Sequence, residues 1–254
     1  MNKPFSSTAH EIKSLLNRDR VHLCFISFEY FSIFDIWFSY IEKFSIDNLC
    51  IVALDHKCYS ELQKRSIKSV FMQSPDIITP KNKRLLWTQR VNLIHDLINL
   101  DITVLHSDAD AFWLKDFSSY LENNTADLIF SIAHGIPKNL VEKWGFILCC
   151  GFFEIKSNDN TKKFMIDYLK RCRDVGDDQK SLNWLLFEKG ISWRNIKPGH
   201  KHGECNYYNI LIDAIPKKTI SRSPIKGISI FHPYLPSNDI SKKLQQALSS
   251  LKLC

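Results

Sequence analysis

Four short apolar runs alternate with amphipathic or polar stretches over the first 105 residues, and this alternation constrains the fold more than any other feature. The runs cover residues 21–27, 49–54, 69–72 and 102–105. Between them, residues 32–44 and 83–100 carry apolar side chains at helical spacing. Continuous apolar runs are typical of strands that are buried on both faces. The sequence therefore predicts an α/β fold with a mostly parallel central sheet flanked by helices.

The pattern changes from residue 126 onward. Apolar runs at residues 127–131, 146–155 and 227–231 predict further strands. Helical spacing predicts helices over residues 160–173, 177–187 and 241–251. Residues 190–205 are polar, basic and rich in histidine, and they read as a loop. The alternatives are that their basic and imidazole groups bind the diphosphate or an acidic acceptor, or that His200 and His202 form an adventitious metal pair. We expect one domain over residues 1–254, with a nucleotide- and metal-binding half at about 20–125 and an acceptor-side half at about 126–254.

Composition excludes several classes of protein without naming a function. The chain has 254 residues, of which 44% are hydrophobic, and Gly and Pro are few, which argues against fibrous or disordered chains. The excess of Lys and Arg over Asp and Glu gives a net charge of +7. This charge suits an anionic ligand or membrane surface, but it is too diffuse to indicate nucleic-acid binding, so no nucleic-acid partner is expected.

The eight cysteines form no C-x-x-C pair, and several lie in apolar strand-like runs where a free thiol packs as a small hydrophobe. The first residues lack the pattern of a signal peptide, and no stretch resembles a membrane span. We expect a reduced, cytoplasmic protein.

Asp108 and Asp110 form the sharpest chemical motif. They directly follow the apolar run 102–105, and in an extended segment residues two apart face the same side. Two convergent carboxylates suit a hard cation such as Mg²⁺ or Mn²⁺ that carries the phosphates of a substrate. The alternative is an ordinary polar loop. The apolar residues 112–114 favour the metal site, because they hold the pair between packed segments.

Residues 104–116, VLHSDADAFWLKD, resemble the D-x-D core of the nucleotide-diphospho-sugar transferases. The closest resemblance is to a retaining group that includes plant arabinosyl- and xylosyltransferases. Weaker similarities follow in the family's order, at residues 51–55, 150–153 and 178–183. The resemblance implies a glycosyltransferase A fold. Two departures are Cys149–Cys150, where the family has an asparagine, and residues 190–205, which have no clear counterpart.

The resemblance also implies a metal site and a phosphate contact. Asp108 and Asp110 would bind Mn²⁺ (or Mg²⁺) and the donor, and His232, just after the last apolar run, would complete the metal site. Lys242, beside Lys243, would contact the phosphates. The alternatives are a strand-end histidine bonded to backbone for His232 and a solvated helix face for Lys242.

Four further residues receive roles from the resemblance. Asp178 and Gln179 would lie near the sugar and act in catalysis, and Arg90 would lie near the donor. Ser27, at the end of the first apolar run, would help to hold the nucleotide base, with Phe28 or Tyr30 available to stack on it. The alternatives are a helix cap for Asp178, an exposed helix residue for Arg90 and core packing for the two aromatic rings.

The implied activity is metal-dependent transfer of a hexose or pentose, with retention, from a nucleoside diphosphate sugar such as a UDP-sugar. The acceptor would be a glycan, either free or linked to a lipid. The net charge of +7 and the lack of a stretch that resembles a membrane span suit peripheral work on lipid-linked acceptors at the inner membrane face, as in polysaccharide biosynthesis. The alternatives are a metal-dependent nucleotidyl- or phosphotransferase, a sugar-nucleotide hydrolase, and a catalytically silent protein that binds nucleotides or carbohydrates.

Overall fold

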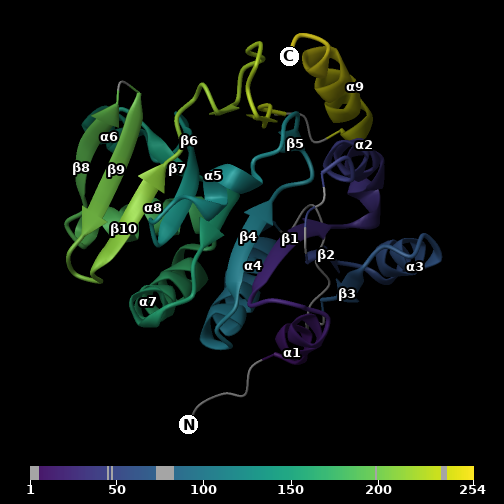
Figure 1. Cartoon of the computed structure of the whole chain (residues 1–254), viewed down its shortest axis with the longest axis horizontal. Coiled ribbons are helices and arrows are strands. Elements are labelled where there is room, and N and C mark those ends of the chain that lie inside the picture. The colour runs from purple at the N-terminus through teal and green to yellow at the C-terminus, as the bar shows by residue number, and fades with distance from the viewer. Residues whose placement is uncertain (1–5, 45, 47, 73–82, 198, 236–238) are drawn as a thin grey trace.

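The computed structural model describes residues 6–44, 46, 48–72, 83–197, 199–235 and 239–254. The stretch between the apolar run 69–72 and the helix expected at 83–100 is polar and contains Pro75 and Pro80, which predicts a loop; it lies outside the described residues. A nine-stranded sheet in the order β3-β2-β1-β4-β7-β6-β10-β9-β8 runs through both halves of the described chain (Figure 1). A smaller sheet in the order β11-β12-β5 accompanies it. None of the described helices is both long enough and apolar enough to cross a membrane.

The first four strands pair in parallel, as the apolar runs predict. They are β1 (Arg20–Ile26), β2 (Leu49–Ala53), β3 (Ser69–Phe71) and β4 (Thr103–Ser107). The accompanying helices are α1 (Ser7–Ser14), η1 (Phe28–Tyr30), α2 (Phe31–Ile41), α3 (His56–Lys64) and α4 (Lys83–Asn99). Helix α3 was not predicted, although Asp55 caps it by accepting a hydrogen bond from the Cys58 N–H at 2.8 Å.

The second half makes the sheet mixed rather than uniformly parallel. Strand β7 (Ile147–Ile155) lies between β4 and β6 (Leu128–Ala133) and is antiparallel to both, whereas β10 (Ile210–Ala214) is parallel to β6. All nine residues of β7 are buried, because strands flank it on both edges and side chains cover both faces. The helices here are α5 (Ser118–Glu122), α6 (Lys138–Trp144), α7 (Asp159–Val175) and α8 (Asp178–Glu188).

The expectation of a loop over residues 190–205 is wrong. The segment forms β8 (Ser192–Lys197) and β9 (His200–Cys205), which pair antiparallel at the edge of the sheet. Most of β8 is exposed, so it lacks the alternation of apolar and polar residues that identifies a strand in sequence. Trp193 packs across Gly203, where an added Cβ would approach its ring within 3.0 Å.

The small sheet brings the end of the chain to the carboxyl end of β4. Strand β5 (Phe112–Trp113) follows the D-x-D segment and pairs with β12 (Ile230–Phe231), which in turn pairs with β11 (Ile220–Ser221). Helix α9 (Ile240–Leu251) comes after β12. The residue that follows β12 therefore lies beside the residues that precede β5.

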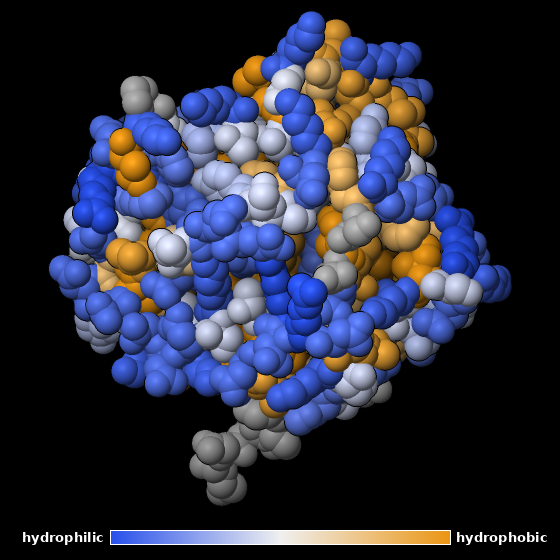
Figure 2. All heavy atoms as spheres, in the orientation of Figure 1, coloured by the Kyte–Doolittle hydropathy of each residue, from blue (hydrophilic) through white to orange (hydrophobic). Residues whose placement is uncertain are grey.

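Side chains of the main sheet alternate between two apolar cores. Val21 and Leu23 belong to the core that includes α1, α4, α7 and α8, whereas Cys24 and Ile26 belong to the core that includes α2, α3, α9 and the small sheet. The face drawn in Figure 2 is largely hydrophilic, and apolar side chains gather over the corner that α2 and α9 occupy. Helices thus cover the sheet and leave the carboxyl end of β4 as the place where polar groups meet.

Candidate functional site

Asp108, Asp110 and His232 converge at the carboxyl end of β4. The Nε2 atom of His232 lies 3.3 Å from Oδ1 of Asp110 and 3.8 Å from Oδ2 of Asp108. One ligand atom from each residue fits within 4.8 Å of the others. The His232 N–H donates to the Ser221 carbonyl at 2.9 Å, which fixes the backbone of His232 beside the small sheet. The structure therefore brings together the three residues that the sequence analysis assigned to a metal site.

Gly151 makes this convergence possible. Its carbonyl accepts a hydrogen bond from the Asp108 N–H at 2.8 Å, so β7 holds the D-x-D turn directly. A Cβ at position 151 would stand 2.1 Å from Cε1 of His232 and 2.8 Å from Oδ2 of Asp108. Both distances are far inside van der Waals contact, so only glycine fits without displacing one of the two ligands.

We expect Gly151→Ala to weaken the binding of Mn²⁺ roughly 10–100-fold, as changes in the groups that support metal ligands do. The added methyl group pushes the His232 ring or the Asp108 carboxylate away from the common point. Calorimetric titration with Mn²⁺ measures the change. Gly135→Ala is the matched control, because a Cβ there meets no atom within 4 Å. Equal Mn²⁺ affinity of both variants would contradict the role given to Gly151.

Arg90 connects Asp108 to Asp178 at the start of α8. Its Nη1 donates to Oδ1 of Asp108 at 2.9 Å, and its Nε donates to Oδ2 of Asp178 at 3.2 Å, with Nη2 in contact with the same oxygen. The Nε2 atom of His106 lies 2.9 Å from the same Nη1 and 3.0 Å from Oδ1 of Asp108. Arg90 is 6% exposed, so the alternative of an exposed helix residue is wrong.

The electrostatics of the cluster suit a cation. Burial raises the pKa of Asp108, but the hydrogen bond from His106 and the charge of Arg90 outweigh burial and hold that pKa below its ordinary value. Burial and Arg222 lower the pKa of His232, whereas hydrogen bonds to Asp110 and Cys149 and the charge of Asp110 raise it, with a net result of about 9. Asp110 and Cys149 thus favour a proton on His232, which a divalent cation bound at this point would displace.

This donor set fits the implied metal ion. Two carboxylate oxygens and one imidazole nitrogen are ligands that Mn²⁺ accepts in proteins. The three ligand atoms converge on one point, because Gly151 has no side chain that would displace His232 or Asp108. Asp108, Asp110 and His232 are therefore the residues that would hold the ion.

The remaining predicted residues lie around this cluster or away from it. Asp178 is 3% exposed, and besides Arg90 its carboxylate accepts a hydrogen bond from the Gln179 N–H at 2.7 Å. The Gln179 side chain donates to the Ile136 carbonyl at 3.1 Å. Ser27 is half-buried at the end of β1, and its carbonyl accepts from the Tyr30 N–H at 3.0 Å.

Lys242 is exposed on α9, whereas Lys243 is 7% exposed and its ammonium contacts the Tyr30 hydroxyl. Burial, then the charges of Asp110 and Asp108, raise the pKa of Tyr30. Of these two lysines, Lys243 is therefore the one that contacts Tyr30, the residue whose pKa Asp108 and Asp110 raise.

Three residues of the site were missed from the sequence. His106 stands two positions before Asp108 on a strand, so alternation could have placed it on the same side. Cys149 was noted only as a departure from the family's asparagine, and Arg222 carries no local signal. Arg222 comes next to His232 only through the small sheet, with Nη1 at 3.1 Å from Nδ1 of His232 and 3.6 Å from Sγ of Cys149.

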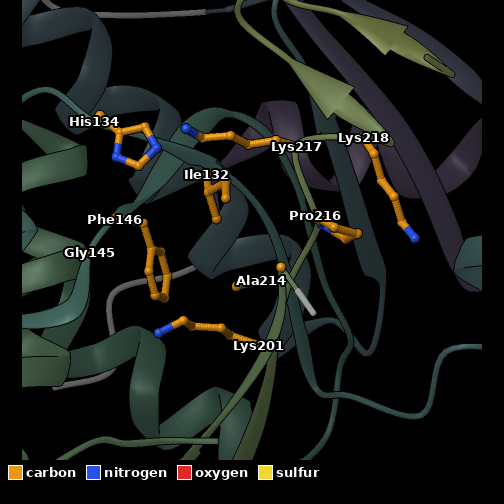
Figure 3. A pocket seen from close by; sticks show the side chains of 10 residues that line it. Ile132, His134, Gly145, Phe146, Lys201, Ala214, Pro216, Lys217 and Lys218 are labelled. Carbon is orange, nitrogen blue, oxygen red and sulfur yellow. The ribbon is translucent and has the colours of Figure 1, made fainter. Parts of the chain in front are cut away.

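A basic pocket of about 320 Å³ opens on the second half of the sheet. Figure 3 shows the side chains of Lys201 and Lys217 on either side of Phe146, and the imidazole of His134 close to the Lys217 ammonium. Burial lowers the pKa of His134, and the charge of Lys217 lowers it further. The complete lining is Ile132, His134, Gly145, Phe146, Gly199, Lys201, Ala214, Pro216, Lys217 and Lys218. The pocket thus combines an aromatic surface with positive charge.

Comparison with known proteins gives one family and one fold. A family model described as nucleotide-diphospho-sugar transferase matches residues 45–223. The galactosyltransferase LgtC, solved with donor and acceptor sugar analogues, is 13% identical with a TM-score of 0.53, over 91% of this chain and 94% of LgtC. A glycosyltransferase involved in the glycosylation of the major capsid of PBCV-1 is 11% identical with a TM-score of 0.50, over 91% of this chain and 98% of that one.

The bifunctional glycosyltransferase WbbM is 10% identical with a TM-score of 0.51, over 98% of this chain and 46% of WbbM. At these identities the likeness concerns the fold, which is the one that the D-x-D resemblance implies. The search of curated proteins gives no match.

Proposed function

The chain belongs to the nucleotide-diphospho-sugar transferase family, and from this premise we propose that it is a metal-dependent, retaining glycosyltransferase that uses a UDP-sugar as donor. The observation that carries the proposal is the convergence of Asp108, Asp110 and His232 at the carboxyl end of β4. Glycosyltransfer needs charge stabilisation at the diphosphate that leaves. An Mn²⁺ or Mg²⁺ ion held by these residues would supply it.

In the proposed reaction, the bond between the anomeric carbon and the diphosphate oxygen breaks, and its electron pair leaves with the nucleoside diphosphate. The acceptor hydroxyl oxygen forms a new bond to the anomeric carbon on the same face, and its proton passes to the leaving phosphate oxygen. The half-buried Gln179 side chain, at the start of α8, is the group assigned to the sugar side. Lys243 is assigned to the diphosphate because it lies against Tyr30, and Lys242 is the second candidate.

We assign Asp178 to positioning rather than to direct contact with the sugar. Its carboxylate is buried in the ion pair with Arg90, and Arg90 in turn holds Asp108. Rigid placement of Asp108, one of the proposed metal ligands, matters because a displacement of about 1 Å in an active site can cost about 100-fold in rate. Ser27, at the end of β1, is assigned to the nucleoside end of the donor.

The acceptor is proposed to be a glycan that carries negative charge, such as one linked to a lipid through a diphosphate. The support for this is the pocket with Lys201, Lys217 and Lys218, together with the net charge of +7. The aromatic face of Phe146 in the same pocket offers a surface for a sugar ring. Work at the cytoplasmic membrane surface would follow from such an acceptor.

Thermal unfolding with a panel of nucleotides and nucleotide sugars tests the proposal. A ligand at about 100 times its Kd stabilises the native state by about 2.7 kcal/mol, which raises Tm by roughly 5–11 °C in a chain of this size. We expect UDP and one UDP-sugar to do this with Mn²⁺ and not with EDTA. Incubation with acceptors, followed by NMR of the anomeric proton, then identifies the reaction.

The other outcomes separate the alternative functions. Sugar released into water without an acceptor would indicate a hydrolase, and transfer of phosphate or nucleotide would indicate the corresponding transferase. Tight binding of UDP without turnover would indicate a silent binding protein. Absence of a shift with every nucleotide would contradict the donor assignment.

A further inference from the structure

A second group of ligand-type side chains lies on the outer part of the main sheet. Strand β9 places His200 and His202 on one face, because residues two apart on a strand face the same side. Asp213 on β10 is the register partner of His202. Lys201, between the two histidines, lines the pocket of Figure 3, and its partner Ala214 lines the same pocket. The histidines therefore face away from that pocket.

The three side chains meet at one carboxylate oxygen. The Nε2 atoms of His200 and His202 lie 2.5 and 3.2 Å from Oδ1 of Asp213. One ligand atom from each residue lies within 4.8 Å of the others. The Asp213 side chain is fully buried, whereas the two imidazoles are 19% and 31% exposed. An ion could thus reach the imidazoles from solvent while the carboxylate stays fixed.

The other oxygen of Asp213 is held by neutral donors. Tyr120 Oη donates to Oδ2 at 2.6 Å, and Asn124 Nδ2 donates to the same oxygen at 2.5 Å. The two oxygens thus have different partners, because Oδ2 accepts from Tyr120 and Asn124 while Oδ1 faces the imidazoles. Hydrogen bonds that fix the orientation of a carboxylate ligand are typical of the groups that surround a metal centre.

We propose that His200, His202 and Asp213 bind a second divalent metal ion of the Zn²⁺ class. Two imidazole nitrogens and one carboxylate oxygen are the borderline donors that Zn²⁺ prefers, and three protein ligands leave a fourth position for water. Asp108, Asp110 and His232 offer two oxygens and one nitrogen, a set better suited to Mn²⁺ or Mg²⁺. The proposal does not depend on the transferase activity.

Such an ion would stabilise the part of the sheet with the least apolar burial. Strand β8 is mostly exposed, and its backbone pairs with β9 at the edge of the sheet. A metal bound to His200 and His202 on β9 and to Asp213 on β10 cross-links these two strands. Asp213 also accepts a hydrogen bond from Tyr120 on α5. Asp213 would therefore link the ion to α5, which follows the D-x-D segment.

Titration with Co²⁺ tests the proposal, because tetrahedral Co²⁺ with nitrogen and oxygen ligands absorbs visible light and reports the site directly. We expect one equivalent of Co²⁺ to give this absorption in the unmodified protein and Zn²⁺ to displace it. His202→Ala should weaken Co²⁺ binding about 100-fold or more. Tyr120→Phe, which keeps all three ligands, should weaken it roughly 10–100-fold.

Two control variants separate this site from other metal binding. Asp110→Ala removes a ligand from the other candidate metal site, at the carboxyl end of β4, and should keep the Co²⁺ absorption. His56→Ala removes an exposed histidine on α3 and should also keep it. Circular dichroism checks that each variant is folded. The proposal is overturned if the unmodified protein gives no tetrahedral absorption, or if His202→Ala and Tyr120→Phe both bind Co²⁺ as tightly as the unmodified protein.

Discussion

Asp110→Ala should lower kcat/KM for sugar transfer at least 1,000-fold, which corresponds to about 4 kcal/mol of lost transition-state stabilisation. Asp110 contributes the carboxylate nearest to His232, and without it the cluster retains one carboxylate and one imidazole. Donor binding should lose its dependence on Mn²⁺ in the same variant. Steady-state transfer rates and Mn²⁺ titrations with the donor measure the two effects.

The matched control is Asp116→Ala, six residues further along the chain. Asp116 is exposed, and its carboxylate accepts a hydrogen bond from the Ser118 N–H at 2.8 Å. This variant should keep nearly full activity. If Asp110→Ala also kept full activity while folded, the metal-dependent mechanism would be wrong.

Arg90→Met should lower the free energy of unfolding by about 3–5 kcal/mol, because it leaves the buried Asp178 carboxylate without its partner. Asp178 is 3% exposed and is paired with Arg90, and Asp108 is held by the same guanidinium. In a chain of this size, a loss of that magnitude corresponds to a fall in Tm of roughly 6–20 °C. Denaturant unfolding and thermal scans measure the loss.

Two further variants show whether the buried pair is the cause. Arg194→Met removes an arginine from the exposed ion pair with Glu204 and should cost less than about 1 kcal/mol. The double variant Arg90→Met/Asp178→Leu removes both charges of the buried pair and should recover part of the stability. Its activity should stay low, because Asp108 still lacks the group that positions it. A double variant no more stable than Arg90→Met would contradict this account.

The sequence predicted the features that depend on neighbouring residues. The parallel strands of the first half are continuous apolar runs, and the D-x-D pair lies where the fourth run ends. His232 was assigned from the family resemblance, and the pairing of β12 with β5 gives the physical reason for its place beside Asp110.

The missed features depend on contacts between distant segments. Arg222 reaches His232 through a strand of two residues, which is too short to leave a periodic pattern. Gly151 was noted as part of a motif, but its importance comes from Asp108 and His232, which follow the ends of two other strands. Residues 190–205 became strands because β10 offers an edge for pairing, and polar edge strands resemble loops in sequence.

The strand order β3-β2-β1-β4-β7-β6-β10-β9-β8 has a consequence for the timing of folding during synthesis. The four parallel strands are complete once residue 107 has been made, whereas β7 must follow before β4 gains its second neighbour. Contacts between distant segments form late because loop closure costs entropy. The carboxylates of Asp108 and Asp110 thus emerge early, and their histidine partner arrives only after residue 231. Most of the chain must therefore be translated before all three proposed ligands of the cation are present.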